Sequence, residues 1–204
     1  MGLESYRRRV SESKRKSIME AAGAEFQGNG FTHAAMAEIA RKADVSTATL
    51  YKHFGSKEEL FSSIVEASYA GLGIPQAAAS EAKTAKEALT SAANDYLNQQ
   101  FGAGINALMR AIISETSGVP EVGKDFLKRG VNGRNDEVVT FLDLLVKRKL
   151  LKPHDTKVSA TQFAGMIKES FVWPTMFDPK FKLPANKDAV IEAAIDTFLA
   201  RYGA

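Results

Sequence analysis

Residues 46–53 carry the side chains of this chain that are best suited to contact with another molecule. Small and hydroxyl-bearing side chains come first, and an aromatic, a lysine and a histidine follow them. When small side chains lead a helix, its backbone can lie deep in the major groove of DNA. There Thr47 can hydrogen-bond a base edge, Ala48 can touch a thymine methyl group, and Lys52 can reach guanine or a phosphate. The segment therefore predicts contact with double-stranded DNA, in which Thr47, Ala48 and Lys52 would read sequence.

Two short amphipathic helical patterns, joined by a turn over residues 43–46, position this segment. The second pattern leaves its polar residues for solvent or a partner. The apolar faces consist of Met36, Ile39, Ala40 and Ala43 in the first pattern and of Leu50 and Phe54 in the second. This is the arrangement of a helix-turn-helix, whose second helix enters the major groove.

The basic residues are concentrated at the start of the chain. Residues 1–57 hold ten Lys and Arg against six Asp and Glu, whereas residues 58–204 hold 17 against 18. A basic arm ahead of a helix-turn-helix fits contact with DNA phosphates. The plainer interpretation is a disordered, solvated terminus. We name Arg9 and Arg15 as the candidate contacts in this arm.

A series of residues in one fixed order runs through the first third of the chain: Gly30-Phe31, Ile39-Ala40, Val45-Ser46, Thr49-Leu50-Tyr51, His53-Phe54 and Ser56-Lys57-Glu58-Glu59-Leu60. With this series, the segment resembles the DNA-binding domain of the TetR/AcrR family of bacterial transcriptional regulators. The resemblance implies that Tyr51 and His53 contact phosphates, as does Lys57, which also lies at a helix N-terminus that attracts anions. Each residue also has a plainer interpretation. Tyr51 could be a half-buried core aromatic, His53 could cap or pack, and Lys52 could be solvated. The complete candidate DNA-binding set consists of Ser46, Thr47, Ala48, Thr49, Tyr51, Lys52, His53, Lys57, Arg9 and Arg15.

Two positions depart from the family pattern. The turn position that is usually Gly is Asp44, and that position often needs a positive φ, which Asp tolerates better than most residues. Ala34 and Ala35 stand where the family often has Thr or Ser. A phosphate contact from those hydroxyls must be absent here, or Thr32 or His33 must replace it.

Composition narrows the class of protein. The 204 residues contain 45% hydrophobic and 25% charged side chains, which is ordinary for a soluble protein with a real core. The sequence contains no run of about 18 apolar residues, so we expect no transmembrane helix. The first residues lack the apolar core of a signal peptide. With no Cys, there is no disulfide or thiolate metal site. We expect a cytoplasmic protein with no cofactor, no metal and no membrane partner.

The chain is expected to be all-α, with about nine to ten helices in two domains. Residues 1–55 would form the basic arm and the three-helix DNA-binding domain, and residues 56–204 a larger helical effector-binding and dimerisation domain. Ser-x-x-Glu capping boxes at Ser56 and Thr84 mark two helix starts. The Gly- and Ala-rich residues 71–80 are interpreted as a connector. The other expected helices cover about residues 13–27, 105–115, 120–149 with a break or kink near residue 130, 156–171 and 187–202.

The last two expected helices are predicted to form a dimer interface. The helix over 156–171 is apolar on more than one side, which indicates burial on both. The family resemblance implies a four-helix interface between two copies, and a two-fold dimer would read two half-sites about 34–36 Å apart. A monomeric core is the alternative. The candidate interface residues are Ala160, Ala164, Ile167, Phe171, Val190, Ala193, Ala194 and Thr197.

The resemblance also implies a small-molecule effector pocket within the middle helices. Side chains rich in Phe and Met favour an apolar or aromatic ligand. Each residue could equally be plain core. The candidate lining residues are Phe101, Met109, Ile113, Phe126, Phe141, Phe163, Met166 and Trp173.

Together these patterns predict a homodimeric, ligand-responsive repressor that binds a palindromic operator. An enzyme is disfavoured, because the three histidines form no catalytic motif and the G-x-G-x-x-A match over 102–107 follows no expected strand. Two alternatives stay open: an activator or ligand-independent regulator of the same fold, and a DNA-binding protein without sequence preference.

Overall fold

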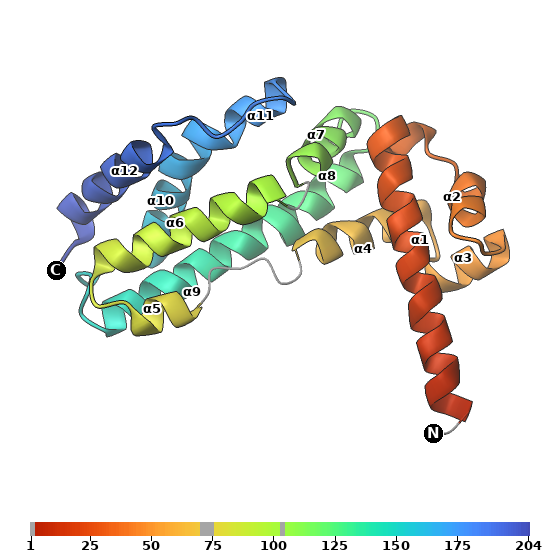
Figure 1. Ribbon diagram of the computed structural model, residues 1–204, viewed down its shortest axis with the longest axis horizontal. Helices are drawn as coiled ribbons and strands as arrows, with labels where there is room; N and C mark the ends of the chain where they lie inside the picture. Colours follow the sequence, from red (N-terminus) through yellow and green to blue (C-terminus); the bar gives the residue numbers. More distant parts are fainter. Residues whose placement is uncertain (1–2, 70–75, 103–104) are drawn as a thin grey trace. The chain divides into compact units, whose positions relative to one another are not determined.

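The computed structural model describes residues 3–69, 76–102 and 105–204, and it divides the chain into two compact units. Within the described residues the regular structure is helical, as predicted (Figure 1). The first unit comprises residues up to 68 together with 107–128, and the second comprises 69–106 and 129–204. The helices of the first unit are α1 (Leu3–His33), α2 (Met36–Lys42), α3 (Thr47–His53), α4 (Lys57–Tyr69), α7 (Ile105–Glu115) and α8 (Pro120–Phe126).

Helix α1 begins ten residues earlier than expected, so the basic arm is helical from Leu3 onward. One pair of opposite charge one turn apart supports this extension, with Arg8 Nε 2.9 Å from Glu12 Oε1. The expected end near residue 27 lies three residues later, at a sharp break at Gly30. Gly30 has φ 74° and ψ 168°, a conformation that is essentially reserved for glycine.

The core of the first unit lies between α1, α2, α3 and α4. Three aromatic rings, those of Phe26, Phe31 and Phe61, contact one another with centroids 5.2 to 5.7 Å apart. Leu50 and Phe54, predicted to be buried, are fully enclosed. Residues 46–53 are therefore fixed to the rest of the unit through the apolar side of α3.

The turn between α2 and α3 is a Schellman motif. The backbone N–H of Val45 donates to the carbonyl of Ala40 at 3.0 Å, and that of Asp44 donates to the carbonyl of Arg41 at 3.3 Å. Asp44 has φ 53°, which confirms that this position needs left-handed backbone. Asp44 thus adopts the left-handed backbone for which the family usually has glycine.

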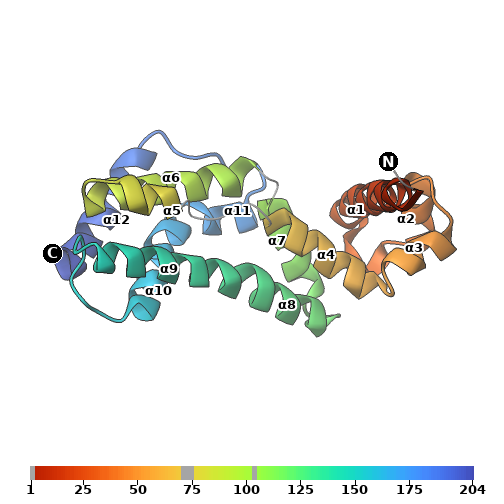
Figure 2. The same ribbon diagram turned by 90° about the horizontal axis from the view of Figure 1, so that it is seen from below.

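The second unit is built from longer helices that pack around one apolar core. Helix α9 packs on α10, α6 on α12, and α10 on α12, as Figures 1 and 2 both show. Its fully buried residues include Leu89, Phe141, Phe171 and Phe198. Its elements are α5 (Gln76–Glu81), α6 (Ala85–Gly102), a π-helix (Leu127–Asn132, which begins in the first unit), α9 (Gly133–Lys147), α10 (Thr156–Phe171), α11 (Trp173–Phe177) and α12 (Lys187–Tyr202).

Both predicted capping boxes are present. The N–H of Glu59 donates to the Ser56 hydroxyl, and the N–H of Glu87 donates to the Thr84 hydroxyl, each at 3.1 Å. In each box the glutamate carboxylate accepts from the N–H one residue ahead of the cap, Gly55 or Lys83, at 2.9 Å. These contacts fix where α4 and α6 begin.

Three short elements differ from the expected helices. The second half of the expected connector is the helix α5, while its residues 71–75 lie outside the described part of the chain. The expected kink near residue 130 is a π-helix, in which the backbone hydrogen bonds span one extra residue. Trp173-Pro174, which is expected to kink or stop the preceding helix, follows the end of α10 at Phe171 and also begins α11, because proline is favoured in the first turn of a helix. The G-x-G-x-x-A match includes residues 103 and 104, which are also outside the described residues.

No described helix is both long enough and apolar enough to cross a bilayer.

Candidate nucleic-acid interface and effector pocket

The polar side of α3 is open to solvent. Ser46, Thr47, Ala48 and Lys52 are exposed, Thr49 and His53 are half-buried, and Tyr51 exposes 48% of its surface. Helix α3 therefore carries its small residues on its first turn and its aromatic and basic residues on the following one. This arrangement offers hydroxyl groups, a methyl group and a cation to a groove.

Ser46 also has a structural task. Its hydroxyl accepts the backbone N–H of Thr49 at 3.1 Å, which caps α3, and its Oγ lies 2.8 Å from Thr49 Oγ1. A serine directly ahead of a short helix is the sequence signal for this cap, which adds to the DNA contact that is predicted for Ser46. The cap holds the leading turn of α3 in shape.

Arg15 stabilises the end of α3. Its guanidinium lies 4.3 Å from the centre of the Phe54 ring, and its two Nη atoms donate to the carbonyl of His53 at 3.4 Å and to Ser63 Oγ at 3.3 Å. Arg15 thus joins α1 to α3 and α4. Arg9, in contrast, is exposed on α1 and is turned to solvent.

Partial burial, followed by the positive charges of Arg15, Lys52 and Lys14, lowers the pKa of the His53 imidazole. The lowered pKa favours a neutral ring near pH 7. A phosphate brought beside the ring would oppose this shift.

Lys57 lies at the start of α4 and contacts the kinked end of α1. Its ammonium donates to the carbonyl of Thr32 at 3.0 Å and lies 4.8 Å from the centre of the Phe31 ring. Partial burial lowers the pKa of the Lys57 ammonium. A lysine ammonium has three donors, so this contact leaves donors for a phosphate.

Glu115, at the end of α7, binds the same corner. Its carboxylate accepts the backbone N–H of Thr32 at 3.1 Å and also the Thr32 hydroxyl. Ala35 is the N-cap of α2 and has no side-chain cap bond. The Thr32 hydroxyl, one candidate to replace a phosphate contact from Ala34 and Ala35, is therefore directed to Glu115.

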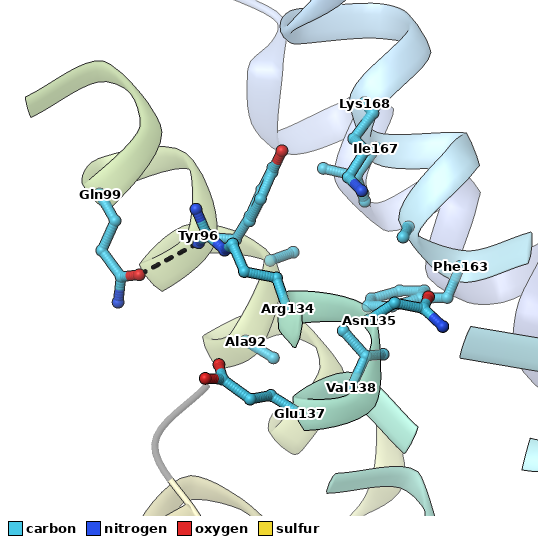
Figure 3. Close-up of a pocket in the computed structure, with 12 residues that line it drawn as sticks. Ala92, Tyr96, Gln99, Arg134, Asn135, Glu137, Val138, Phe163, Ile167 and Lys168 are labelled. Carbon is cyan, nitrogen blue, oxygen red and sulfur yellow. Dashed lines mark hydrogen bonds between the residues drawn. The ribbon is translucent and has the colours of Figure 1, made fainter. Parts of the chain in front are cut away.

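A pocket lies within the second unit, between α6, α9 and α10 (Figure 3). It encloses an empty space of about 550 Å³, which includes open solvent at its mouth. Its walls combine apolar side chains with two cations, one carboxylate and two amides. The lining residues are Ala92, Ala93, Tyr96, Gln99, Arg134, Asn135, Glu137, Val138, Phe163, Ala164, Ile167 and Lys168.

Of the eight residues predicted to line an effector pocket, the structure brings Phe163 to this one. Phe141 is fully buried in the core, and Trp173 is 52% exposed on α11. Phe101 and Met166 are partly buried against the core of the second unit but do not line the pocket. The remaining three belong to the first unit, and they are Met109, Ile113 and Phe126.

Sequence reasoning missed the polar residues of the pocket. The Arg134 guanidinium lies 4.8 Å from the centre of the Tyr96 ring and donates to the Gln99 and Gln100 side-chain oxygens at 3.2 and 3.4 Å. Lys168 continues the helical row that contains Ala160 and Ala164. A lysine in an otherwise apolar row was the signal that could have identified the site.

The residues predicted to form the dimer interface divide into two groups. Within a single chain, Ala160, Ile167, Phe171 and Ala194 are already buried in the core of the second unit, and Ala164 lines the pocket. The apolar faces of α10 are covered by α9 and α12, which periodicity alone could not distinguish from a partner chain. Ala193 and Thr197 are exposed on α12, and Val190 is half-buried.

Clusters of His, Cys, Asp and Glu that could hold a metal ion are absent from the described residues.

Family models match most of the chain. Residues 18–64 match the bacterial regulatory proteins of the tetR family, and residues 87–204 match the C-terminal domain of AefR-like transcriptional repressors.

Solved structures agree with these matches. A TetR-family regulator of Mesorhizobium loti is 27% identical, with a TM-score of 0.84 over 95% of this chain and 98% of its own. A TetR-family regulator of Pseudomonas syringae pv. tomato is 28% identical, with a TM-score of 0.74 over 93% and 96%. The flavonoid-responsive regulator FrrA is 26% identical, with a TM-score of 0.76 over 93% and 97%.

One curated relative matches over a shorter stretch. The A-factor receptor protein of Streptomyces griseus is 41% identical over 51 residues, which are 25% of this chain and 18% of the receptor.

Proposed function

Because the chain belongs to the TetR family of bacterial transcriptional regulators, we propose that it is a homodimeric repressor that leaves a palindromic operator when a small effector binds its second unit. The observation that carries this proposal is the solvent-exposed side of α3. A regulator of chromosomal DNA acts in the cytoplasm, and we place the protein there.

Two kinds of contact would hold the first unit on DNA. Thr47, Ala48 and Lys52 would read base edges, since they lie on the exposed face of α3. Tyr51, His53 and Lys57 would bind phosphates and fix the docking position. Arg9 would add a phosphate contact from α1, while Arg15 would act by holding α3 in place.

Two copies would associate through α10, α11 and α12. Helix α12 exposes small residues, among them Ala193 and Thr197, which allow a second helix to approach closely. Val158, Trp173 and Phe177 are large apolar residues that are at least half exposed on α10 and α11. Exposed apolar residues gathered on neighbouring elements are typical of an interface.

The effector would bind the pocket between α6, α9 and α10. Tyr96 and Phe163 suit an aromatic group, and Ala92 and Ala164 leave room for one. FrrA, with its response to flavonoids, supports control by a small molecule in a protein of this fold. The effector would release DNA by binding more tightly to a state that does not fit the operator.

The double variant Tyr51→Ala with Lys52→Ala tests the DNA-binding surface. Two lost contacts of 1–3 kcal/mol each should weaken operator binding by about a hundredfold or more. Binding would be measured by fluorescence anisotropy with duplexes from the region upstream of the gene, at about 150 mM salt, where non-specific binding is weak. Sedimentation of the complex should give two chains for each operator.

Lys147→Ala is the matched control, since Lys147 is an exposed lysine on α9 in the other unit. It should bind the operator as the unchanged protein does, and both variants should keep the helical circular dichroism spectrum. A double variant that still binds the operator would show that α3 is not the recognition helix.

A further inference from the structure

We propose that the pocket of the second unit binds a monocarboxylic acid with an apolar or aromatic body, and that the Lys168 ammonium pairs with its carboxylate. This inference rests on the proposed effector function, because it names the chemical class of the effector. It makes the expected apolar or aromatic ligand more specific by adding a carboxylate to it.

Lys168 is the cation that carries the argument. Its side chain is half-buried on α10 and lines the pocket beside Ile167 and Ala164. Among the described residues, no hydrogen bond or ion pair joins the Lys168 ammonium to the protein. A half-buried cation without a protein partner has lost part of its solvation, and an anion bound beside it would offset that loss.

Arg134 adds a second positive charge to the same pocket. It comes from the start of α9, and its guanidinium is held in place against the Tyr96 ring and by Gln99 (Figure 3). Burial and the charge of Arg134 lower the pKa of the Lys168 ammonium. A carboxylate between α9 and α10 would favour the charged form of Lys168 and raise the pKa again.

The pocket lining contains one carboxylate, and it is not directed toward the Lys168 ammonium. Glu137 lines the pocket, but Figure 3 shows its carboxylate directed away from Lys168. Arg134 and Lys168 outweigh Glu137 by one positive charge. A ligand with one negative charge matches this excess, whereas a phosphate dianion would overshoot it.

The remaining walls define the body of the ligand. Phe163, Val138 and Ile167 present apolar surface, and the alanines of α6 leave space between the helices. An aromatic ring or a medium-length aliphatic chain can fill such a site, with its acid group toward Lys168.

Two acids and their neutral amides test the proposal: 3-phenylpropionate with 3-phenylpropionamide, and octanoate with octanamide. Each would be titrated into the purified full chain without DNA, near neutral pH, by isothermal calorimetry. At least one acid should bind about tenfold more tightly than its amide, because a charge-assisted hydrogen bond is stronger than a neutral one. Lys168→Met should bring the acid down to the affinity of its amide, and Lys168→Arg should retain the preference.

Lys157→Met is the matched control, since Lys157 is an exposed lysine on the same helix, and it should keep the preference for the acid. Equal binding of acid and amide to the unchanged protein would overturn the proposal. So would an acid preference that survives Lys168→Met, or the absence of binding by both acids up to about 1 mM.

A separate titration of the protein–operator complex distinguishes this proposal from the proposed function. If an acid binds through Lys168 but does not release the operator, the ligand class holds and the effector-controlled release fails. If DNA is released by a neutral compound instead, the release holds and the carboxylate proposal fails.

Discussion

The exposed side of α3 and the pocket of the second unit hold their polar groups under opposite conditions. On α3, hydroxyls and cations stand in water on consecutive residues, and short local hydrogen bonds such as the Ser46 cap fix the backbone beneath them. In the pocket, Arg134 and Lys168 come from different helices and are partly removed from water. DNA contact by α3 therefore depends on backbone shape, whereas ligand binding in the pocket depends on charge.

This difference determines how each region should fail. Loss of packing or of a special backbone conformation in the first unit should spoil DNA binding while the pocket remains intact. A change of one charge in the pocket should alter ligand choice while the fold remains intact. The following variants test this division, from the largest expected effect to the smallest.

Phe54→Ala removes a fully buried ring from beneath α3 and should destabilise the first unit by about 3–5 kcal/mol. Hydrogen exchange measured by mass spectrometry should show faster exchange in α2 and α3 and little change in α6. Phe141→Ala, at an equally buried site of the second unit, should give the opposite pattern. If either substitution accelerates exchange equally in both units, the units are not separate and the comparison fails.

Gly30→Ala should destabilise the first unit by about 1–3 kcal/mol, because φ 74° with ψ 168° is strained for any other residue. The new Cβ would also lie 2.5 Å from Glu115 Oε1. Urea unfolding measures the loss. Gly28→Ala, on α1 with open space around it, should instead stabilise by about 0.5–1 kcal/mol. Equal effects of the two substitutions would contradict the special role of residue 30.

Operator affinity should rise as the pH falls from about 7.5 to about 6, by at most about tenfold per pH unit for each His53 and so by at most about a hundredfold for the dimer. The pKa of His53 is lowered in the free protein, and a bound phosphate would raise it, so the complex would take up a proton. Anisotropy titrations across this range would measure the trend. His53→Gln should flatten this trend. A flat profile in the unchanged protein would contradict the predicted contact between His53 and a DNA phosphate.

The parts of the molecule that could be predicted from the sequence depend on neighbouring residues. The helix-turn-helix, the two capping boxes and the left-handed conformation of Asp44 are written within a few residues of one another, where local rules apply. The burial of Leu50 and Phe54 followed from spacing along one helix.

The pocket and the interface could not be read in the same way. Tyr96, Arg134 and Lys168 meet only after three helices have packed, and no spacing rule joins them. The spacing on α10 showed that Ala160 and Ile167 would be buried, but not that α9 and α12 of the same chain would cover them. Predictions based on composition also favoured Phe and Met over the charged residues of the pocket.

The contact of Glu115 with Thr32 has a consequence for the exchange of modules between relatives. The DNA-binding unit is discontinuous, since residues 107–128 complete what residues 3–68 begin. In a chimaera that joins another regulator's first 68 residues to this chain, Glu115 would face a residue 32 region from a different protein. To transfer the operator specificity of one regulator to another, residues 3–68 and residues 107–128 should therefore be exchanged together.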